Sequence, residues 1–387
     1  MSATASRTTR PERPNPEKVP FLDLSGTTEE VRGVVEASWR EVMHSNRFIG
    51  GPAVSAFERD WAAYCGTAHA IGVANGTDAL HWTLRALGVG PGDDVILPAN
   101  TFVATAEAVV LAGARPRFAD VDARTLLLTP ENVEAVVTPA TRAIVVVHLY
   151  GQMPDMDRLD ATARRLGVHL IEDAAQAHGA RWGSRRAGSS GVAGCFSFYP
   201  GKNLGAFGDA GAVVTSNDEL ALALDALRDH GRSGDGHYDH RLLGTNSRLD
   251  ANQAVVLSAK LPLLDGWNDK RRALMAVYRE LLDPEVAPLV DELPGGAGVH
   301  HLAVVRVRDR ERVRSRLAER GIDTGIHYPV PCHLMAPYTR FAERPLPTAE
   351  HAGAHVLSLP MYPHLAMATV ECVALAVNAA ARRELVR

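Results

Sequence analysis

Short apolar segments alternate with amphipathic helical patterns between about residue 53 and residue 230 of this 387-residue chain. Strands that are apolar along their whole length are typical of a parallel sheet that helices cover on both faces. The expected strands are Ala70–Val73, Val95–Pro98, Arg117–Val121, Ala143–Leu149, Val168–Glu172, Cys195–Phe198 and Ala212–Thr215. The expected helices include Ala53–Tyr64, Asp78–Leu87, Asp157–Leu166 and Asp218–Asp229. This alternation predicts an α/β fold whose ligands bind at the carboxyl ends of the strands.

The pattern changes from about Asp250, where helical segments lead into a Pro/Gly-rich joint, DELPGGAG. The elements expected here are helices Asp250–Leu264 and Asn268–Leu282, a strand Leu302–Val307, a helix Arg310–Arg320, a strand near Asp323–Tyr328 and a helix within Met367–Arg387. They predict a smaller α/β domain packed beside the large one. We therefore expect a flexible polar tail over residues 1–18, a large domain over 19–265 and a small C-terminal domain over 266–387.

Composition and charge exclude several classes of protein. The formal net charge is −4, whereas a nucleic-acid-binding domain normally carries a basic surplus. No apolar run approaches the ~20 residues that span a membrane, and the N-terminal segment lacks the apolar region of a secretory signal. The histidines show no HExxH pattern, and no metal-binding spacing occurs among Cys65, Cys195, Cys332 and Cys372. We expect a cytoplasmic protein with no metal, no nucleic-acid partner and no membrane partner.

Lysine is scarce in this chain. Only four of the 41 basic residues are lysines, namely Lys18, Lys202, Lys260 and Lys270. Because this chain uses arginine where a positive surface charge suffices, a remaining lysine has a raised chance of being needed for its amine. Lys202 lies in a Gly-rich loop between two expected strands. A lysine that forms a Schiff base must approach its carbonyl partner from a closely packed backbone, which suits Gly201 and Gly205, and it needs a lowered pKa. The simpler alternative is a solvated loop lysine.

Asp173 directly follows the expected strand that ends at Glu172, in the segment VHLIEDAAQAHGA. A carboxylate at a strand end can face the pyridine nitrogen of pyridoxal phosphate (PLP). It then keeps that nitrogen protonated, and the protonated ring serves as an electron sink. Alternatively, Asp173 caps a following Ala-rich helix.

Other strand ends offer contacts to a phosphate or to a flat ring. The chain turns from a strand into a helix at Gly76 and Thr77, where free amides, the positive helix end and a hydroxyl favour a phosphate. Ser197 can add a hydrogen bond from a neighbouring strand end. Phe102 follows another strand and can stack on a heteroaromatic ring, although an aromatic residue at such a place also fits a core.

Two nucleotide-binding motifs lack support. No G-x-G-x-x-G stands between a strand and a helix, which argues against a standard nicotinamide site. The dipeptide at Gly201 and Lys202 resembles a P-loop only superficially, because Asn203 replaces Ser or Thr and Phe196 stands where the motif requires glycine.

Five motifs occur in the order GTDAL, TFVAT, EDAAQAHGA, SFYPGKNLGAFGDAGAVVT and GTNSRLDANQA. In this order they resemble the DegT/StrS-type PLP-dependent sugar aminotransferases, whose fold is aspartate-aminotransferase-like (PLP fold type I). The resemblance extends from about Val19 to near the C-terminus and is densest between Gly72 and Leu264.

The resemblance implies a role for each matching residue. Lys202 would form the internal aldimine with PLP and move the proton, while Asp173 would pair with the pyridinium nitrogen. Gln176 would hydrogen-bond the ring hydroxyl, and Phe102 would stack on the ring. The phosphate would be held by Gly76, Thr77, Ser197 and, from the neighbouring subunit, Asn246.

The resemblance also implies transamination through a pyridoxamine phosphate form, because dehydratases of the family carry histidine in place of Lys202. The implied substrates are L-glutamate and a dTDP-linked keto-6-deoxy sugar, aminated at C-3 or C-4, in the biosynthesis of amino-deoxysugars such as those of antibiotics. Asn246 implies a homodimer with a shared active site.

Three further residues match positions near the sugar or its diphosphate, namely Phe48, Arg248 and His327. A structural role for His327 and a role for Arg248 in bracing the dimer stay open. Two alternative functions also stay open: an aminotransferase for a keto-cyclitol, and a PLP-binding sensor without turnover.

Overall fold

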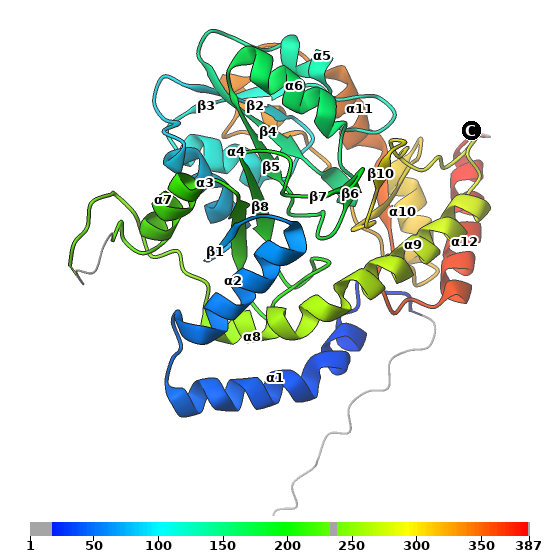
Figure 1. Ribbon diagram of the computed structural model, residues 1–387. Coiled ribbons are helices and arrows are strands. Elements are labelled where there is room, and N and C mark those ends of the chain that lie inside the picture. The colour runs from blue at the N-terminus through cyan, green and yellow to red at the C-terminus, as the bar shows by residue number, and fades with distance from the viewer. Residues whose placement is uncertain (1–17, 233–237, 386–387) are drawn as a thin grey trace, which may run out of the picture.

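The computed structural model describes residues 18–232 and 238–385. Within them, seven strands form one sheet in the order β1-β9-β8-β5-β4-β2-β3 (Figure 1). The strands are β1 (His69–Val73), β2 (Asp94–Pro98), β3 (Arg115–Ala119), β4 (Thr141–Val147), β5 (His169–Asp173), β8 (Ala193–Ser197) and β9 (Gly211–Thr215). All seven predicted strands are present, with ends shifted by a few residues. The predicted tail over residues 1–18 lies outside the described residues, apart from Lys18.

The sheet is mostly parallel, as predicted. β2 pairs in parallel with β3 and β4, and the parallel pairing continues from β4 to β5 and from β5 to β8. β9 alone runs antiparallel to its two neighbours, β1 and β8. The carboxyl ends of β1, β2, β4, β5 and β8 therefore lie along one edge of the sheet, where a ligand is expected.

Helices cover both faces of the sheet. They are α1 (Ser25–Ser45), α2 (Gly51–Cys65), α3 (Gly76–Ala86), α4 (Val103–Leu111), α5 (Pro130–Glu134), α6 (Met156–Leu166), α7 (Asp218–Arg228) and α8 (Ala251–Lys260). Side chains of β4 alternate between two separate apolar cores: Ile144 and Val146 pack in the core that contains Trp61, whereas Ala143 and Val145 pack in the other. Burial on both faces explains why β4 is apolar at every position from Ala143 to Val147.

A third apolar core lies in the C-terminal part of the chain. Its elements are α9 (Leu264–Leu281), β11 (Ala303–Arg306), α10 (Arg310–Ala318), β12 (Val356–Leu359) and α12 (Met367–Leu385), and α11 (Pro347–His355) precedes β12. The strand predicted near Asp323–Tyr328 is wrong, because there only Gly325 forms a β-bridge, with Ser358. The antiparallel partner of β11 is β12. β12 has four residues and follows α11 directly, so its hydrophobic pattern is too short to be distinguished from that of the preceding helix.

The predicted boundary after residue 265 falls inside α9. Leu264 packs in the first core of the sheet, whereas Leu274 and Tyr278 of the same helix pack in the third core. Val19, expected in the large domain, forms a β-bridge with Ile322 of the C-terminal part. The domain division therefore stays a prediction. Figure 1 shows how α9 leads from the large sheet to α12.

Several short elements complete the described chain. A second sheet has three two-residue strands, β6 (Arg181–Trp182), β7 (Arg185–Arg186) and β10 (Gly296–Ala297). The 3-10 helices are η1 (Leu149–Gly151), η2 (Leu261–Leu263), η3 (Cys332–Leu334) and η4 (Thr339–Phe341). Among the helices in residues 18–232 and 238–385, none has the length and apolar character needed to cross a membrane.

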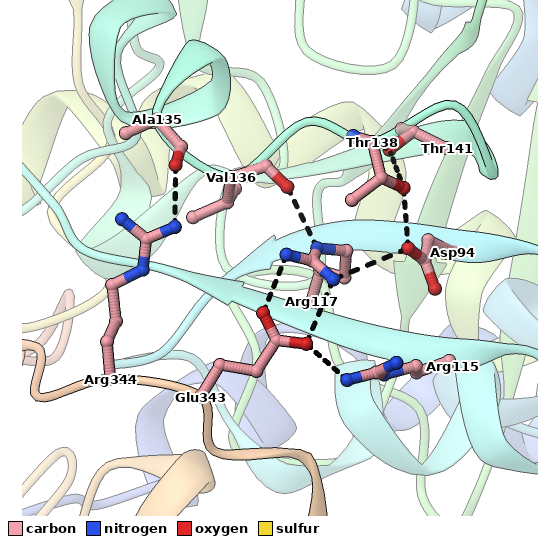
Figure 2. A network of polar contacts seen from close by, with 9 residues as sticks. All are labelled: Asp94, Arg115, Arg117, Ala135, Val136, Thr138, Thr141, Glu343 and Arg344. Atoms are coloured by element: carbon pink, nitrogen blue, oxygen red, sulfur yellow. Dashed lines mark hydrogen bonds and ion pairs between the residues drawn. The ribbon is translucent and has the colours of Figure 1, made fainter.

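The segment after η4 covers the open edge of the sheet at β3. Figure 2 shows Glu343 between Arg115 and Arg117, two side chains of β3. Arg117 also donates to the carbonyl of Val136 (2.8 Å), and the neighbouring Arg344 donates to the carbonyl of Ala135 (2.7 Å). Such a cover protects the unpaired backbone groups of an edge strand from pairing with another chain.

Candidate active site

A cavity of about 470 Å³ lies where the carboxyl ends of the strands meet the C-terminal part of the chain. Most of the predicted site residues are brought together there, although they come from distant segments. Eight of the eleven line the cavity: Gly76, Thr77, Phe102, Asp173, Gln176, Ser197, Lys202 and His327.

Lys202 lies in a closely packed loop between β8 and β9, with its amide donating to the carbonyl of Tyr199 (2.8 Å). A Cβ on Gly205 would lie 2.3 Å from the carbonyl oxygen of Pro200, so the loop requires glycine there. Burial lowers the pKa of the Lys202 amine to about 8, although the nearby carboxylate of Asp173 opposes this shift. Lys202 is therefore no ordinary solvated lysine. Its amine becomes neutral at a pH where a nucleophile can act.

Asp173 ends β5 with its carboxylate at the cavity and is 6% exposed. Its Oδ2 accepts a hydrogen bond from the Thr105 hydroxyl (2.8 Å), and its Oδ1 accepts one from the Ala175 amide (3.2 Å). Burial raises the pKa of this carboxyl, although both hydrogen bonds oppose the rise. The next element is β6 rather than a helix, so capping does not explain Asp173. A buried carboxylate of this kind is best matched by a cationic partner.

Glu172 lies on the opposite face of β5, because successive strand residues alternate. Its buried carboxylate accepts a hydrogen bond from the ring of His148 (2.7 Å). It also accepts three bonds of 2.6–2.8 Å from amides of the following loop, at Gly188, Ser190 and Gly191. Burial alone would raise the pKa of Glu172, but these bonds together lower it. Glu172 thus fastens the strand end that carries Asp173.

We expect Glu172→Gln to lower the free energy of unfolding by roughly 3 kcal/mol, because an amide NH₂ would replace an acceptor oxygen among buried donors. Denaturant unfolding of the cofactor-free protein measures the loss. Glu134→Gln is the matched control, since Glu134 forms an exposed ion pair with Arg165 and should lose at most ~1 kcal/mol. Equal losses in both variants would contradict the assigned role.

The N-terminus of α3 supplies the predicted phosphate contacts. Asn75 caps the helix by accepting from the Asp78 amide (2.9 Å), whereas the amides of Gly76 and Thr77 have no acceptor within the helix. A Cβ on Gly76 would lie 2.6 Å from the Cβ of Ser197, so the two segments are in close contact. Free amides, two hydroxyls and the positive helix end together suit a phosphate group.

Gln176 and Phe102 both contact Tyr328, which was not predicted. Gln176 accepts a hydrogen bond from the Tyr150 amide (2.7 Å) through Oε1 and donates to the Tyr328 hydroxyl (3.0 Å) through Nε2. The ring of Phe102 lies 5.4 Å from the ring of Tyr328. Phe102 is 51% exposed, so it borders the cavity rather than filling a core.

His327 lines the cavity and is also anchored to its surroundings. Its Nδ1 lies 2.9 Å from the hydroxyl of Ser358, and its ring stacks on Phe21 at 5.7 Å. Burial lowers the pKa of His327 to about 4, with the positive charge of Lys202 adding to the shift. The imidazole is therefore neutral at physiological pH, and both the structural and the substrate-binding role remain compatible with its position.

Three predicted residues lie outside the cavity. Asn246 is exposed and accepts from the Arg248 guanidinium (3.1 Å), which also pairs with Asp229 (2.9 Å). Phe48 is 44% exposed, and its carbonyl accepts from the Ala251 amide (3.0 Å). Within the described part of the chain, these three side chains do not line the cavity, so their predicted roles stay predictions.

Sequence reasoning missed several residues of the site. Thr105 orients Asp173 and itself contacts Thr101 (2.8 Å), four positions earlier in TFVAT. Two threonines four positions apart, one just before α4 and one on its first turn, were the available signal. Tyr328 follows the predicted His327 directly. His301 also lines the cavity, but nothing in the sequence distinguishes it from the chain's other histidines.

A model of the DegT/DnrJ/EryC1/StrS aminotransferase family matches residues 32–378. The chain belongs to this family. A Streptomyces venezuelae relative named dTDP-3-amino-3,4,6-trideoxy-alpha-D-glucose transaminase is 48% identical over 357 residues, which cover 90% of this aminotransferase and 92% of the relative. The erythromycin biosynthesis sensory transduction protein EryC1 of Saccharopolyspora erythraea is 44% identical, with 94% and 100% covered.

Solved structures confirm the fold of the aminotransferase. The structure of S. venezuelae DesV in complex with a ketimine intermediate superposes with a TM-score of 0.91 at 48% identity, covering 95% of this chain and 99% of DesV. The predicted aspartate-aminotransferase-like fold (PLP fold type I) is therefore confirmed. A structure of NtdA from Bacillus subtilis with bound PMP has a TM-score of 0.87 at 31% identity, covering 95% of this chain and 86% of that chain.

The family is PLP-dependent, and the cavity of this aminotransferase fits the cofactor. The amine of Lys202 has the lowered pKa that covalent capture requires. The buried carboxylate of Asp173 suits a protonated ring nitrogen. Gly76 lets the N-terminus of α3 lie against Ser197, where a Cβ would collide with that residue, so free amides and a hydroxyl come together, which suits the phosphate.

Proposed function

We propose that this aminotransferase transfers the amino group of L-glutamate to the keto carbon of a dTDP-linked keto-6-deoxy sugar. The observation that carries the proposal is the 48% identity to the S. venezuelae transaminase named above, over 90% of this chain. A second relative, from Aneurinibacillus thermoaerophilus, is 42% identical and is named dTDP-3-amino-3,6-dideoxy-alpha-D-galactopyranose transaminase. Both names place the amino group at C-3, so we expect a 3-keto sugar to be preferred over a 4-keto sugar.

The geometry of the cavity supports the following roles. PLP, when bound, supplies the electron sink that makes the Cα proton of the amino donor acidic. The neutral amine of Lys202 takes this proton from Cα of the amino donor. In the second half-reaction it delivers a proton to the sugar carbon that receives the amino group. Asp173 keeps the ring nitrogen protonated, because its buried carboxylate is best satisfied by a cation. Thr105 holds that carboxylate in place through its hydroxyl.

The remaining contacts orient the cofactor. The amides of Gly76 and Thr77 and the hydroxyl of Ser197 bind the phosphate at the α3 N-terminus. Gln176 donates to the ring hydroxyl from the position where it now contacts Tyr328. Phe102, which borders the cavity, covers one face of the ring.

We also propose a homodimer in which the second copy completes the cavity. Asn246 and Arg248 lie outside the cavity of their own chain, as residues that serve a neighbouring subunit would. Large apolar side chains are exposed close to them in sequence, among them Leu243 at 83%. Burial of such side chains favours association, and Asn246 of the partner subunit would then reach the phosphate.

The proposal is tested with purified protein, PLP, L-glutamate and a panel of dTDP-3-keto and dTDP-4-keto sugars. We expect amination of a dTDP-keto sugar, with the amino carbon identified by product analysis. Keto-inositols in the same assay test the cyclitol alternative, which a product from them alone would favour.

Because one relative is named a sensory transduction protein, a PLP-binding sensor without turnover is the second candidate function. Glutamate alone distinguishes a sensor from an enzyme. A transaminase converts its cofactor to the pyridoxamine form, and the visible absorbance band then bleaches, whereas a sensor without turnover keeps the band unchanged.

A further inference from the structure

His301 lines the cavity, but none of the roles proposed above involves this histidine. It precedes β11, is half-buried and lines the same cavity as Lys202. Its Nδ1 lies 3.0 Å from the side-chain oxygen of Asn203, the residue that follows Lys202 in the chain. The imidazole is therefore fixed beside the loop that carries the reactive amine.

A chain of amide groups fixes which ring nitrogen of His301 carries the proton. Asn203 Nδ2 donates to the backbone carbonyl of Val299 (3.0 Å) and to Asn268 Oδ1 (2.9 Å), while Asn268 Nδ2 donates to the carbonyl of His178 (2.9 Å). Backbone carbonyls only accept, so neither amide can be reversed without placing two oxygens together. Asn203 Oδ1 must then accept, and the proton lies on Nδ1 of His301.

The other ring nitrogen of His301, Nε2, therefore carries a lone pair. Burial holds the pKa of His301 well below its ordinary value, and the charges of Lys202 and Arg271 act in the same direction, so the ring is neutral at physiological pH. Within residues 18–232 and 238–385, no hydrogen bond is recorded for Nε2, and the ring borders the cavity. The cavity wall thus presents a fixed, uncharged hydrogen-bond acceptor.

We propose that His301 is a substrate-binding residue whose Nε2 accepts a hydrogen bond from a hydroxyl group of the keto sugar. This inference rests on the proposed function and assigns His301 to one of its two half-reactions. A sugar hydroxyl can donate to a lone pair, whereas the carboxylates of glutamate offer acceptors only and gain nothing from it. His301 therefore favours the hydroxyl-bearing substrate over the carboxylate-bearing one.

The test measures the two half-reactions separately by the absorbance of the bound cofactor. His301→Phe keeps a ring but removes the acceptor, so kcat/KM of the dTDP-keto-sugar half-reaction should fall about 10- to 100-fold. The glutamate half-reaction should change far less. His301→Gln places an amide oxygen near the position of Nε2 and should restore part of the loss.

His300→Asn is the matched control, because this neighbouring histidine is buried, pairs with Glu292 (3.2 Å) and does not line the cavity. Both half-reactions should stay near the wild-type rate in this variant. Equal loss in both half-reactions of His301→Phe, or no loss in either, overturns the inference. If the wild-type protein aminates no dTDP-keto sugar, the proposed function itself fails, which is a different outcome.

Discussion

Lys202→Ala is expected to lower turnover by roughly 10⁴-fold or more, the upper end of what one positioned proton-transfer group contributes. The variant loses the amine that captures the cofactor and that moves the proton in both half-reactions. The fold should be retained, because Lys202 borders a cavity and its side chain belongs to none of the apolar cores of the described chain. Steady-state turnover with glutamate and a keto sugar measures the loss, and circular dichroism checks the fold.

Borohydride reduction supplies a second readout that does not depend on turnover. It should fix PLP to Lys202 in the wild-type protein and to no lysine in Lys202→Ala. Lys260 is the informative comparison, since burial also lowers the pKa of its amine to about 8. However, the Lys260 amine donates to the carbonyl of Gly205 (2.7 Å) and lies outside the cavity lining. A label on Lys260, or near-wild-type turnover in Lys202→Ala, would refute the assignment.

The fold was largely predictable because the burial of its strands is recorded in their composition. In β4 the five residues from Ala143 to Val147 are buried on both faces, so this continuous apolar run differs clearly from the pattern of a helix. β12 was missed because four buried residues directly after a helix show no distinct period. The segment Asp323–Tyr328 was mistaken for a strand: Gly325 alone forms a bridge there, Ile326 packs against an apolar core, and His327 and Tyr328 line the cavity instead.

The site was predictable only in part, for a different physical reason. Residues at or just past strand ends, such as Asp173 and Gly76, could be predicted because a parallel sheet gathers its carboxyl ends at one edge. His301 could not be assigned, because its position depends on how the C-terminal part packs against the loop of Asn203. Asn246 lies outside the cavity of its own chain, so the role proposed for it can be tested only in the proposed homodimer.

Asp173→Asn is expected to slow turnover about 10²- to 10³-fold and to weaken the binding of PLP. A neutral amide cannot hold the proton on the ring nitrogen, and an oriented charge in a buried site contributes an effect of this size. The amide has nearly the same shape as the carboxylate. Its oxygen can accept from the Ala175 amide while its NH₂ group donates to the Thr105 hydroxyl oxygen, so the geometry should persist. Single-turnover rates and a PLP titration measure the two effects, and wild-type values for both would contradict the role.

The same substitution should act differently on the cofactor-free protein. Burial raises the pKa of Asp173 in the folded chain above its value in the unfolded chain. At a pH between these two pKa values, the carboxyl is therefore protonated in the folded chain and ionised in the unfolded chain. Stability contributed by this group therefore falls as pH rises through that window, and at pH 7 the empty cavity holds a costly buried charge. Asn removes that charge. We expect the cofactor-free variant to melt at or above the wild-type temperature at pH 7, with the difference vanishing below about pH 4, where the unfolded carboxyl is also protonated. A lower melting temperature of the variant at pH 7 would mean that the carboxylate stabilises the fold. A higher melting temperature together with slower turnover would mean that the carboxylate destabilises the empty fold and acts by pairing with a cationic ring.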